Sequence, residues 1–400
     1  MTAERLRLIT EDDPQLAARM RGWRHAIHAN PETAFEEVQT AALVAEQLRA
    51  FGLQVHTGIA ATGLVGVLRS GNGQRAIGLR ADMDALHIQE QNEFAHRSRN
   101  DGRMHACGHD GHTAMLLGAA AHLASTKRFD GTVYFIFQPA EENEGGGRRM
   151  VEEGLFERFA MEAVYGLHNI PGMPVGQFTI VSGPALASFD TFEITVRGKG
   201  GHAAMPQRTI DPVVVGSQLV SALQTIVSRT VDPLDSGVVS VTSMHAGETW
   251  NVVPDTCVLR GSVRAFDEKV RGTIEEKLRS LATGLCASFG ASAEVRYERR
   301  YPATVNAPRE SALARAMAAR EFGNERVVAD ARPLMASEDF AFMLRAKAGC
   351  FALTGNGAGT PGAPCELHNP RYDFNDDVLG WGATYWVRLV EHSLPPGESR

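Results

Sequence analysis

Nine consecutive residues carry a high density of side chains that bind metals. The segment from Met104 to His112 reads Met-His-Ala-Cys-Gly-His-Asp-Gly-His, and it is followed along the chain by Glu141 and Glu142, by His168 and by His368. Thiolate, imidazole and carboxylate groups are the ligands that hold zinc, manganese or cobalt in proteins. These residue types therefore indicate a metal site with one acid left over to move protons, as metal-assisted hydrolysis requires.

Each of these residues also has an ordinary structural explanation. A single cysteine such as Cys107 is most often a small buried hydrophobic residue, and the paired glutamates could be two solvated acids before a run of glycines. A catalytic pair of Cys107 with His109 is another alternative, but two residues of separation in a loop aim an imidazole poorly at a thiol. His105 and His112 are weaker candidates, because either could cap the following helix or bond a neighbouring carbonyl.

The candidate residues follow predicted strands of a mixed α/β fold. Helical spacing of apolar residues predicts helices over 16–29 and 36–51, and apolar runs predict strands over 64–68, 76–81 and 132–137. The last run is apolar throughout, as is typical of a strand that is covered on both faces of a largely parallel sheet. A helix over 113–125 would connect the last two strands, with its N-terminus toward the His/Cys segment. Ligands bind at the carboxyl ends of such strands, so Glu141, His168 and His368 are expected to meet at one edge.

The middle of the chain has a different pattern. Strand, helix, strand, strand, helix and strand are predicted over 189–196, 212–229, 238–244, 256–266, 268–288 and 293–300. This order is the split βαβ, or ferredoxin-like, arrangement βαββαβ. The metal-binding residue types lie on both sides of it, which indicates an insertion. We expect a catalytic domain in two parts, residues 1–187 and 301–400, and an inserted lid or dimerisation domain, residues 188–300.

Length and composition agree with an enzyme of two domains. The 400 residues exceed what one hydrophobic core usually covers, and 44% hydrophobic with 22% charged residues is ordinary globular usage. A net charge of −7 argues against nucleic acid as a partner. The first residues lack the apolar core of a secretory signal and no segment is long enough to span a membrane, so a cytoplasmic location is expected. An odd number of cysteines without Cys-x-x-Cys spacing argues against a disulfide framework: Cys107, Cys257, Cys286, Cys350 and Cys365.

Six motifs together resemble a known family. They are Leu-Arg-Ala-Asp-Met-Asp-Ala-Leu at 79–86, the His/Cys segment, Gln-Pro-Ala-Glu-Glu at 138–142, Gly-Gly-His-Ala-Ala at 200–204, Asn-Val-Val-Pro at 251–254 and Ser-Glu-Asp-Phe at 337–340. The combination is similar to the metallo-amidohydrolases typified by hippurate hydrolase, N-acyl-amino-acid amidohydrolases and plant auxin-conjugate hydrolases, with carboxypeptidase G as a more distant relative. The resemblance covers nearly the whole chain and implies a catalytic domain like that of the zinc exopeptidases.

The resemblance also implies roles for individual residues. Two divalent ions would be held by Cys107, His109, Glu142, His168 and His368. Manganese, zinc and cobalt all remain candidates for these ions. Glu141 would be the general base, and His202 would stabilise the oxyanion from the partner subunit of a dimer. Asn251 and Arg264 would contact the substrate, since a guanidinium is a natural fork for an α-carboxylate. Asp82 stands where distant members have a histidine ligand, and Asp84 would at most orient a ligand.

The implied activity is the hydrolysis of the amide bond of N-acyl amino acids to a carboxylic acid and a free amino acid. The expected partners are this small-molecule substrate and further copies of the chain, in a homodimer or a higher homo-oligomer. A dipeptidase, an aminopeptidase or a carbamoylase of the same fold is the nearest alternative. A non-catalytic ligand-binding protein with a structural metal is the alternative from another class, and His202 could be an ordinary turn residue. The sequence does not indicate the acyl group, the amino acid or the effect of Gln207.

Overall fold

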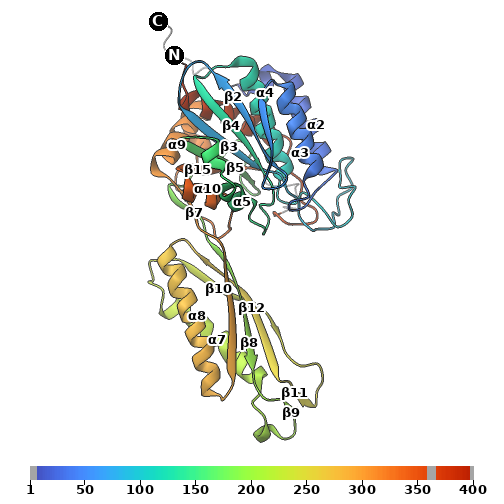
Figure 1. Cartoon of the computed structure of the whole chain (residues 1–400), viewed down its shortest axis with the longest axis vertical. Helices are drawn as coiled ribbons and strands as arrows, with labels where there is room; N and C mark the ends of the chain where they lie inside the picture. Colours follow the sequence, from blue (N-terminus) through green and yellow to red (C-terminus); the bar gives the residue numbers. More distant parts are fainter. Residues whose placement is uncertain (1–6, 358–365, 397–400) are drawn as a thin grey trace. The chain divides into compact units, whose positions relative to one another are not determined.

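The computed structural model describes residues 7–357 and 366–396. The chain forms two compact units. Unit 1 consists of Met1–Ala185, Val305–Arg332 and Asp339–Arg400, and unit 2 consists of Leu186–Thr304 and Pro333–Glu338. The middle of the sequence thus forms a unit of its own, and the chain before it and after it builds the other (Figure 1).

Unit 1 is built around a seven-stranded mixed sheet. Its strands, in spatial order, are β1 (Gln54–Ile59), β2 (Gly63–Ser70), β4 (Gly131–Gln138), β3 (Ala76–Asp82), β5 (Ala163–Ile170), β15 (Gly349–Gly355) and β6 (Phe178–Thr179). Neighbouring strands from β4 to β15 run parallel, and the outer pairs at both edges are antiparallel. The expected mixed sheet with a parallel centre is confirmed, and the half-exposed edge strand β1 is an addition to it.

Helices cover both faces of this sheet. They are α1 (Ile9–Asp12), α2 (Pro14–His28), α3 (Val38–Ala50), α4 (His109–Thr126), α5 (Gly146–Glu152), α6 (Leu155–Arg158), α9 (Pro308–Phe322), α10 (Phe340–Ala346) and α11 (Val378–Ser393). On β5, Tyr165 joins the core beneath α4 and α11, while the next residue, Gly166, packs against Phe340 of α10. Successive strand residues point to opposite faces, so these helices lie on opposite sides of the sheet.

Helix α4 lies in the middle of one helix layer, with α2, α3 and α11 packed around it. It is buried along most of its length, and small residues allow close approach: a Cβ on Gly111 would collide with Phe374, and one on Gly118 with Met20. The helix begins at His109, four residues before the predicted start, because Gly108 turns the chain with a φ of 97°. A predicted ligand is therefore the first residue of a buried helix.

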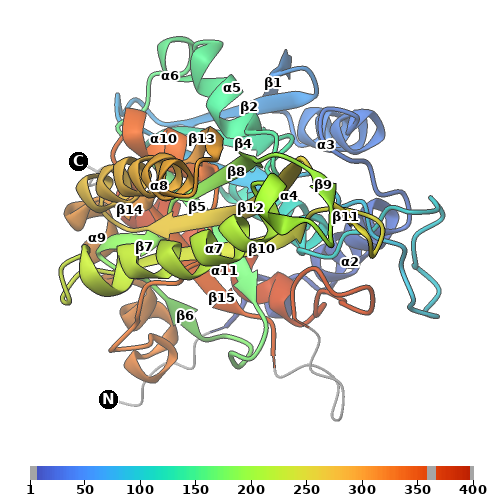
Figure 2. The same ribbon diagram turned by 90° about the horizontal axis from the view of Figure 1, so that it is seen from below.

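Unit 2 is a four-stranded antiparallel sheet with two helices. In chain order its main elements are β8 (Phe189–Arg197), α7 (Pro212–Arg229), β10 (Gly237–His245), β12 (Thr256–Ala265), α8 (Glu268–Ser288) and β13 (Ser292–Tyr301). The spatial order β10-β12-β8-β13 is that of a ferredoxin-like sheet. Helices α7 and α8 pack against one another and against the sheet (Figure 2). Asp211 and Asp267 cap these helices by accepting hydrogen bonds from backbone N–H groups of their first turns.

Short elements complete the chain: β7 (Gly183–Leu186), β9 (Gly201–His202), η1 (Pro206–Arg208), β11 (Val252–Val253), β14 (Thr304–Asn306) and η2 (Asn324–Arg326). Strands β9 and β11 pair with one another in unit 2. None of the helices in the described part of the chain has the length and apolar character that crossing a membrane needs. Cys107, Cys257, Cys286 and Cys350 are buried and free, and Cys365 lies outside the described residues.

Candidate metal centre

Five side chains of unit 1 that were predicted as ligands come together in the structure. Ligand atoms of Cys107, His109 and His168 lie within 4.8 Å of one another, and so do those of Cys107, Glu142 and His368. The Cys107 sulfur is 3.4 Å from Nε2 of His168, and Nε2 of His368 is 3.2 Å from Oε1 of Glu142. Residues from the start of α4, from β5 and from two loops thus converge on one point.

Hydrogen bonds set the orientation of two of the imidazoles. His109 donates from Nδ1 to the backbone carbonyl of Asp84 at 2.8 Å, with the Asp84 carboxylate at 3.2 Å, and His168 donates from Nδ1 to the carbonyl of Asn169 at 2.5 Å. A proton on Nδ1 leaves the lone pair on Nε2 of each ring, which is the arrangement that ligating histidines use. Nε2 of His168 lies 3.4 Å from the Cys107 sulfur, and a ring nitrogen of His109 belongs to the same cluster. Asp84 therefore orients a candidate ligand.

The paired acids leave the end of β4 on a tight turn. Ala140 has a φ of 54°, and its N–H is held at 2.9 Å by the buried carboxylate of Glu37. The N–H of Glu142 donates to Oδ2 of Asp84 at 2.9 Å. Because the segment turns, the two glutamates do not point in opposite directions as an extended segment would make them: both offer an oxygen within 4.8 Å of a His109 nitrogen. Glu141 is thus beside the five-residue cluster.

Charges inside the cluster perturb its ionisation. Burial raises the pKa of the Cys107 thiol, and the Glu142 carboxylate adds to that effect. Hydrogen bonds with Cys107 and Glu142 raise the pKa of His368 to about 10. Burial lowers the pKa of His168, and the neighbouring ring of His112 lowers it further. Burial opposes protonation of His109 as well, but Asp82 and Cys107 outweigh it and raise its pKa. Protons and divalent ions therefore compete for the same atoms.

The structure corrects the expectations for the two other histidines of the segment. His112 lies inside α4 rather than before it, and it joins Oδ1 of Asp82 at 2.6 Å to Oδ1 of Asn169 at 2.7 Å. His105 neither caps the helix nor bonds a carbonyl, since neither of its ring nitrogens has a hydrogen-bond partner among the described residues. Burial lowers the pKa of His105 to about 4. No sequence pattern marked Asn169 beyond its place next to His168.

The three other predicted site residues lie in unit 2. His202 is exposed on β9, where it pairs with Val252 of β11. Asn251 precedes β11, and its carbonyl accepts a hydrogen bond from the N–H of Ala203 at 3.0 Å, so His202 and Asn251 are neighbours. Arg264 lies near the far end of β12, roughly 25 Å along the strand from its start at a rise of about 3.3 Å per residue. Within this unit, Arg264 is therefore remote from the other two.

The donor set fits divalent metal ions. Nε2 of His109 is buried and makes no hydrogen bond among the described residues, whereas the buried Oε1 of Glu142 is paired with Nε2 of His368 at 3.2 Å. Buried polar atoms almost always have a partner, so an unpartnered imidazole nitrogen in this cluster indicates that something else binds there. One thiol, three imidazoles and a carboxylate suit zinc, manganese or cobalt.

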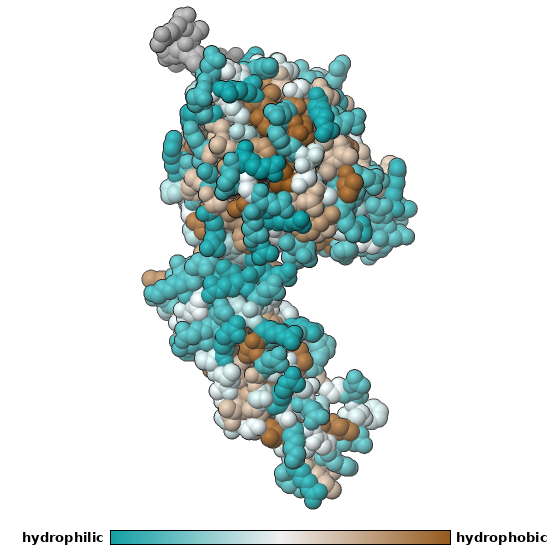
Figure 3. Space-filling view, viewed as in Figure 1, coloured by the Kyte–Doolittle hydropathy of each residue, from teal (hydrophilic) through white to brown (hydrophobic). Residues whose placement is uncertain are grey.

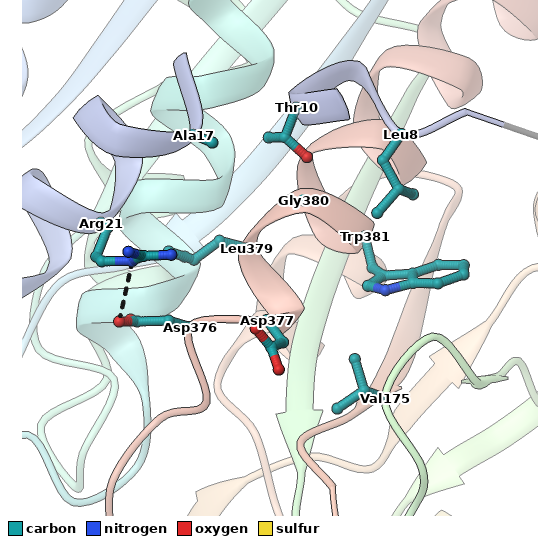
Figure 4. Close-up of a pocket in the computed structure, with 10 residues that line it drawn as sticks. All are labelled: Leu8, Thr10, Ala17, Arg21, Val175, Asp376, Asp377, Leu379, Gly380 and Trp381. Atoms are coloured by element: carbon teal, nitrogen blue, oxygen red, sulfur yellow. Dashed lines mark ion pairs between the residues drawn. The ribbon is translucent and has the colours of Figure 1, made fainter. Parts of the chain in front are cut away.

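Another hollow of unit 1 lies apart from this cluster. It is a cavity of about 420 Å³ lined by side chains of α2, α11 and the segments before them (Figure 4). The guanidinium of Arg21 reaches the carboxylate of Asp376 at 3.5 Å, and Trp381 forms one wall (Figure 4). None of the predicted site residues lines it.

Comparison with known proteins defines the class of this protein. Residues 78–392 match the model of Peptidase family M20/M25/M40. A hippurate hydrolase from Campylobacter jejuni is 42% identical over 92% of this chain and 94% of its own length, and an IAA-amino acid hydrolase from Arabidopsis thaliana is 40% identical over 94% and 86%. A Bacillus subtilis structure described as a dinuclear metal-binding peptidase of the M20 family superposes with a TM-score of 0.82, at 34% identity over 96% of this chain and 99% of that one.

The protein is thus a hydrolase of the metallopeptidase type. The chain belongs to Peptidase family M20/M25/M40, and the expected resemblance to the amidohydrolases of that family is confirmed.

Proposed function

We propose that this protein hydrolyses the amide bond of N-acyl amino acids and releases a carboxylic acid and a free amino acid. The observation that carries the proposal is the convergence of five ligand side chains with Glu141, together with the unpartnered Nε2 of His109. The names of the two relatives, a hippurate hydrolase and an IAA-amino acid hydrolase, support this substrate class.

In the proposed mechanism, two divalent ions would be held by Cys107, His109, Glu142, His168 and His368. When bound, such ions supply positive charge that polarises an amide carbonyl and makes water a better nucleophile. Glu141 accepts a proton on its carboxylate from the attacking water and then delivers a proton to the nitrogen of the departing amine. Loss of a positioned acid or base of this kind costs about 10²- to 10⁴-fold in rate.

We assign substrate contacts to unit 2. The guanidinium of Arg264 stacks over the ring of Phe189 at 4.2 Å, and its Nη1 is buried without a hydrogen-bond partner among the described residues. A fixed guanidinium with a spare donor suits the α-carboxylate of the amino-acid part. Asn251 contacts the acyl part, and His202 donates to the oxyanion, where removal of one donor costs about 10²- to 10³-fold.

We propose a homodimer in which His202 serves the site of the partner subunit. The separation of His202 from Arg264 along β12 favours this arrangement over one in which a single copy of unit 2 supplies both groups. Strand β10 is an edge of its sheet, and exposed apolar side chains lie on the same unit (Figure 3): Met205, Val213, Val214, Met244, Trp250 and Val252. Light scattering that gives a single species of 43.3 kDa would contradict the dimer.

Two substitutions test the catalytic assignment. Glu142→Ala should lower the metal content, whereas Glu141→Gln should keep the metal and lose turnover of hippurate. Wild-type rates in both variants would contradict the assignment. Tight ligand binding without turnover, unaffected by Glu141→Gln, would instead indicate a non-catalytic binding protein.

An activity panel identifies the substrate. Hippurate, N-acetyl amino acids, dipeptides and carbamoyl amino acids are compared, each with added manganese, cobalt or zinc. Preference for dipeptides would indicate a dipeptidase or an aminopeptidase, and preference for carbamoyl amino acids a carbamoylase.

A further inference from the structure

The loop that carries the two acids, residues 139–147, is here called the acid loop. Its ends are tied together, since the N–H of Gly146 donates to the carbonyl of Ala140 at 2.9 Å. The loop leaves β4 at Gln138 and leads into α5. Glu141 is 7% exposed, so its orientation is set by protein groups more than by solvent.

Asp339, from the Ser-Glu-Asp-Phe motif, holds the far end of the acid loop. Its carboxylate is fully buried and accepts hydrogen bonds from the N–H of Gly147 at 2.7 Å and from Nε2 of Gln138 at 2.8 and 2.9 Å. The residue before the loop and the last residue of the loop are therefore bound to the same side chain. Nothing in the metal-binding motifs requires this aspartate, and the proposed mechanism does not use it.

Arg80 compensates the charge of Asp339 in the interior. Its Nη2 lies 3.1 Å from the Asp339 carboxylate, its Nη1 2.7 Å from Asp82, and its Nε 2.8 Å from Oε1 of Gln138. A buried carboxylate is tolerated only when it is paired and hydrogen-bonded, and removal of one partner leaves the other charge uncompensated. Asp339 is thus fixed on three sides by strands β3 and β4 and by the acid loop.

The backbone of the same residue contacts the proposed general base. The N–H of Asp339 donates to Oε1 of Glu141 at 3.2 Å. We propose that Asp339 is a positioning residue for the hydrolysis proposed above: its side chain, anchored by Arg80 and Gly147, fixes the backbone N–H that orients Glu141. The inference rests on the proposed role of Glu141. A displacement of about 1 Å at a reacting group can cost on the order of 10²-fold in rate, so the loss of this anchor acts on kcat.

Asp339→Asn tests the proposal, because it removes the charge and keeps the shape. We expect kcat for hippurate to fall on the order of 10²-fold, while KM stays within about twofold and the metal content is unchanged. The double variant Glu141→Gln/Asp339→Asn should be no slower than Glu141→Gln alone, since a residue that acts only through Glu141 has nothing further to lose. Independent, multiplying effects or a wild-type kcat in Asp339→Asn would overturn the proposal.

Gly147→Ala reaches the same contact from the acid loop. A Cβ at this position would lie 3.0 Å from Oδ1 of Asp339, 3.1 Å from its carbonyl oxygen and 3.0 Å from Oε1 of Gln138. It therefore displaces Asp339 or its partner Gln138 while the buried ion pair stays chemically intact. This variant serves where Asp339→Asn does not fold, and the same non-additivity with Glu141→Gln is expected.

Asp130→Asn is the matched control: Asp130 also accepts a backbone N–H, from Gly73 at 2.6 Å, but it precedes β4 at the end opposite Gln138. Its kcat should equal that of the wild type.

A crystal structure of Asp339→Asn separates this inference from the proposed function. We expect the Glu141 carboxylate to leave the N–H of residue 339. If no substrate of the panel is cleaved by the wild type, the proposed function fails, and the crystal structure still decides whether Asp339 positions Glu141. An unmoved Glu141 would refute the positioning role.

Discussion

Gly108 lies between two candidate ligands, and replacing it by alanine should loosen the metal centre. The residue has a φ of 97°, which L side chains rarely adopt. An added Cβ would lie 2.3 Å from Oδ1 of Asn169 and 2.8 Å from the hydroxyl of Tyr372. The Asn169 amide donates to that hydroxyl at 2.5 Å and its Oδ1 is 2.7 Å from Nε2 of His112, so the amide cannot move without losing buried hydrogen bonds.

The structure gives the size of the effect as a sum of two terms. A left-handed conformation costs about 1–2 kcal/mol for a residue with a Cβ. Leaving a buried hydrogen-bonding group without its partner costs about 1–3 kcal/mol more. We therefore expect Gly108→Ala to lower the free energy of unfolding by roughly 2–5 kcal/mol and to weaken metal binding, because Cys107 and His109 are displaced.

Gly102→Ala is the control that separates the two terms. Gly102 has a φ of 74°, but a Cβ there meets nothing within 4 Å, so only the conformational term applies. Urea denaturation of both variants, with and without added metal, measures the difference in the free energy of unfolding. If Gly108→Ala were no less stable than Gly102→Ala and bound metal as the wild type does, the argument from the collision would be refuted.

Three further predictions concern charge and metal. Burial lowers the pKa of His28, but hydrogen bonds with Asp110 and Glu90 raise it to about 9. The protonated histidine therefore adds about 3 kcal/mol to the free energy of unfolding. This contribution is fully present below pH 6.5 and is lost as the pH rises through 9. Urea denaturation from pH 6 to 10 should show that the free energy of unfolding falls less steeply with pH in His28→Gln than in the wild type. An equal fall in both would contradict the raised pKa of His28. Asp190→Ala breaks the fully buried pair with Arg271 and should cost about 3–5 kcal/mol, read from thermal unfolding, without changing the metal content. Exhaustive chelation should abolish hydrolysis of hippurate and added manganese, cobalt or zinc should restore it, whereas full activity after chelation would refute a metal-dependent mechanism.

Much of the fold follows from local patterns in the sequence. The apolar run of β4 predicted a strand that is covered on both faces. On one face it is covered by α4, and α2 and α11 pack against α4. The alternation of apolar and polar residues in β8 and the helical spacing of α7 predicted a strand and a helix, and the structure has both in unit 2. Strand β1 was missed because its residues are half-exposed at a sheet edge and show no clean alternation.

The residues of the candidate site were predictable from their types, but their supports were not. Cys107, His109 and Glu142 carry metal-binding groups in short motifs, and the resemblance to a known family implied their roles as ligands. Glu37 holds the N–H of Ala140 across 103 positions of sequence, and no local pattern marks such a contact. The start of α4 was predicted too late, since a glycine with positive φ can begin a helix at the residue after it.

The candidate ligands differ in burial, because one of them begins the buried helix α4 and another lies in an exposed segment. His109 is fully buried at the start of helix α4, which is enclosed by other helices. The backbone amides inside α4 should be among the slowest in the chain to exchange hydrogen with solvent. On the opposite side, the side chain of His368 is 51% exposed and its backbone has a φ of 64°. The His368 side of the cluster is therefore the side at which a candidate ligand meets solvent.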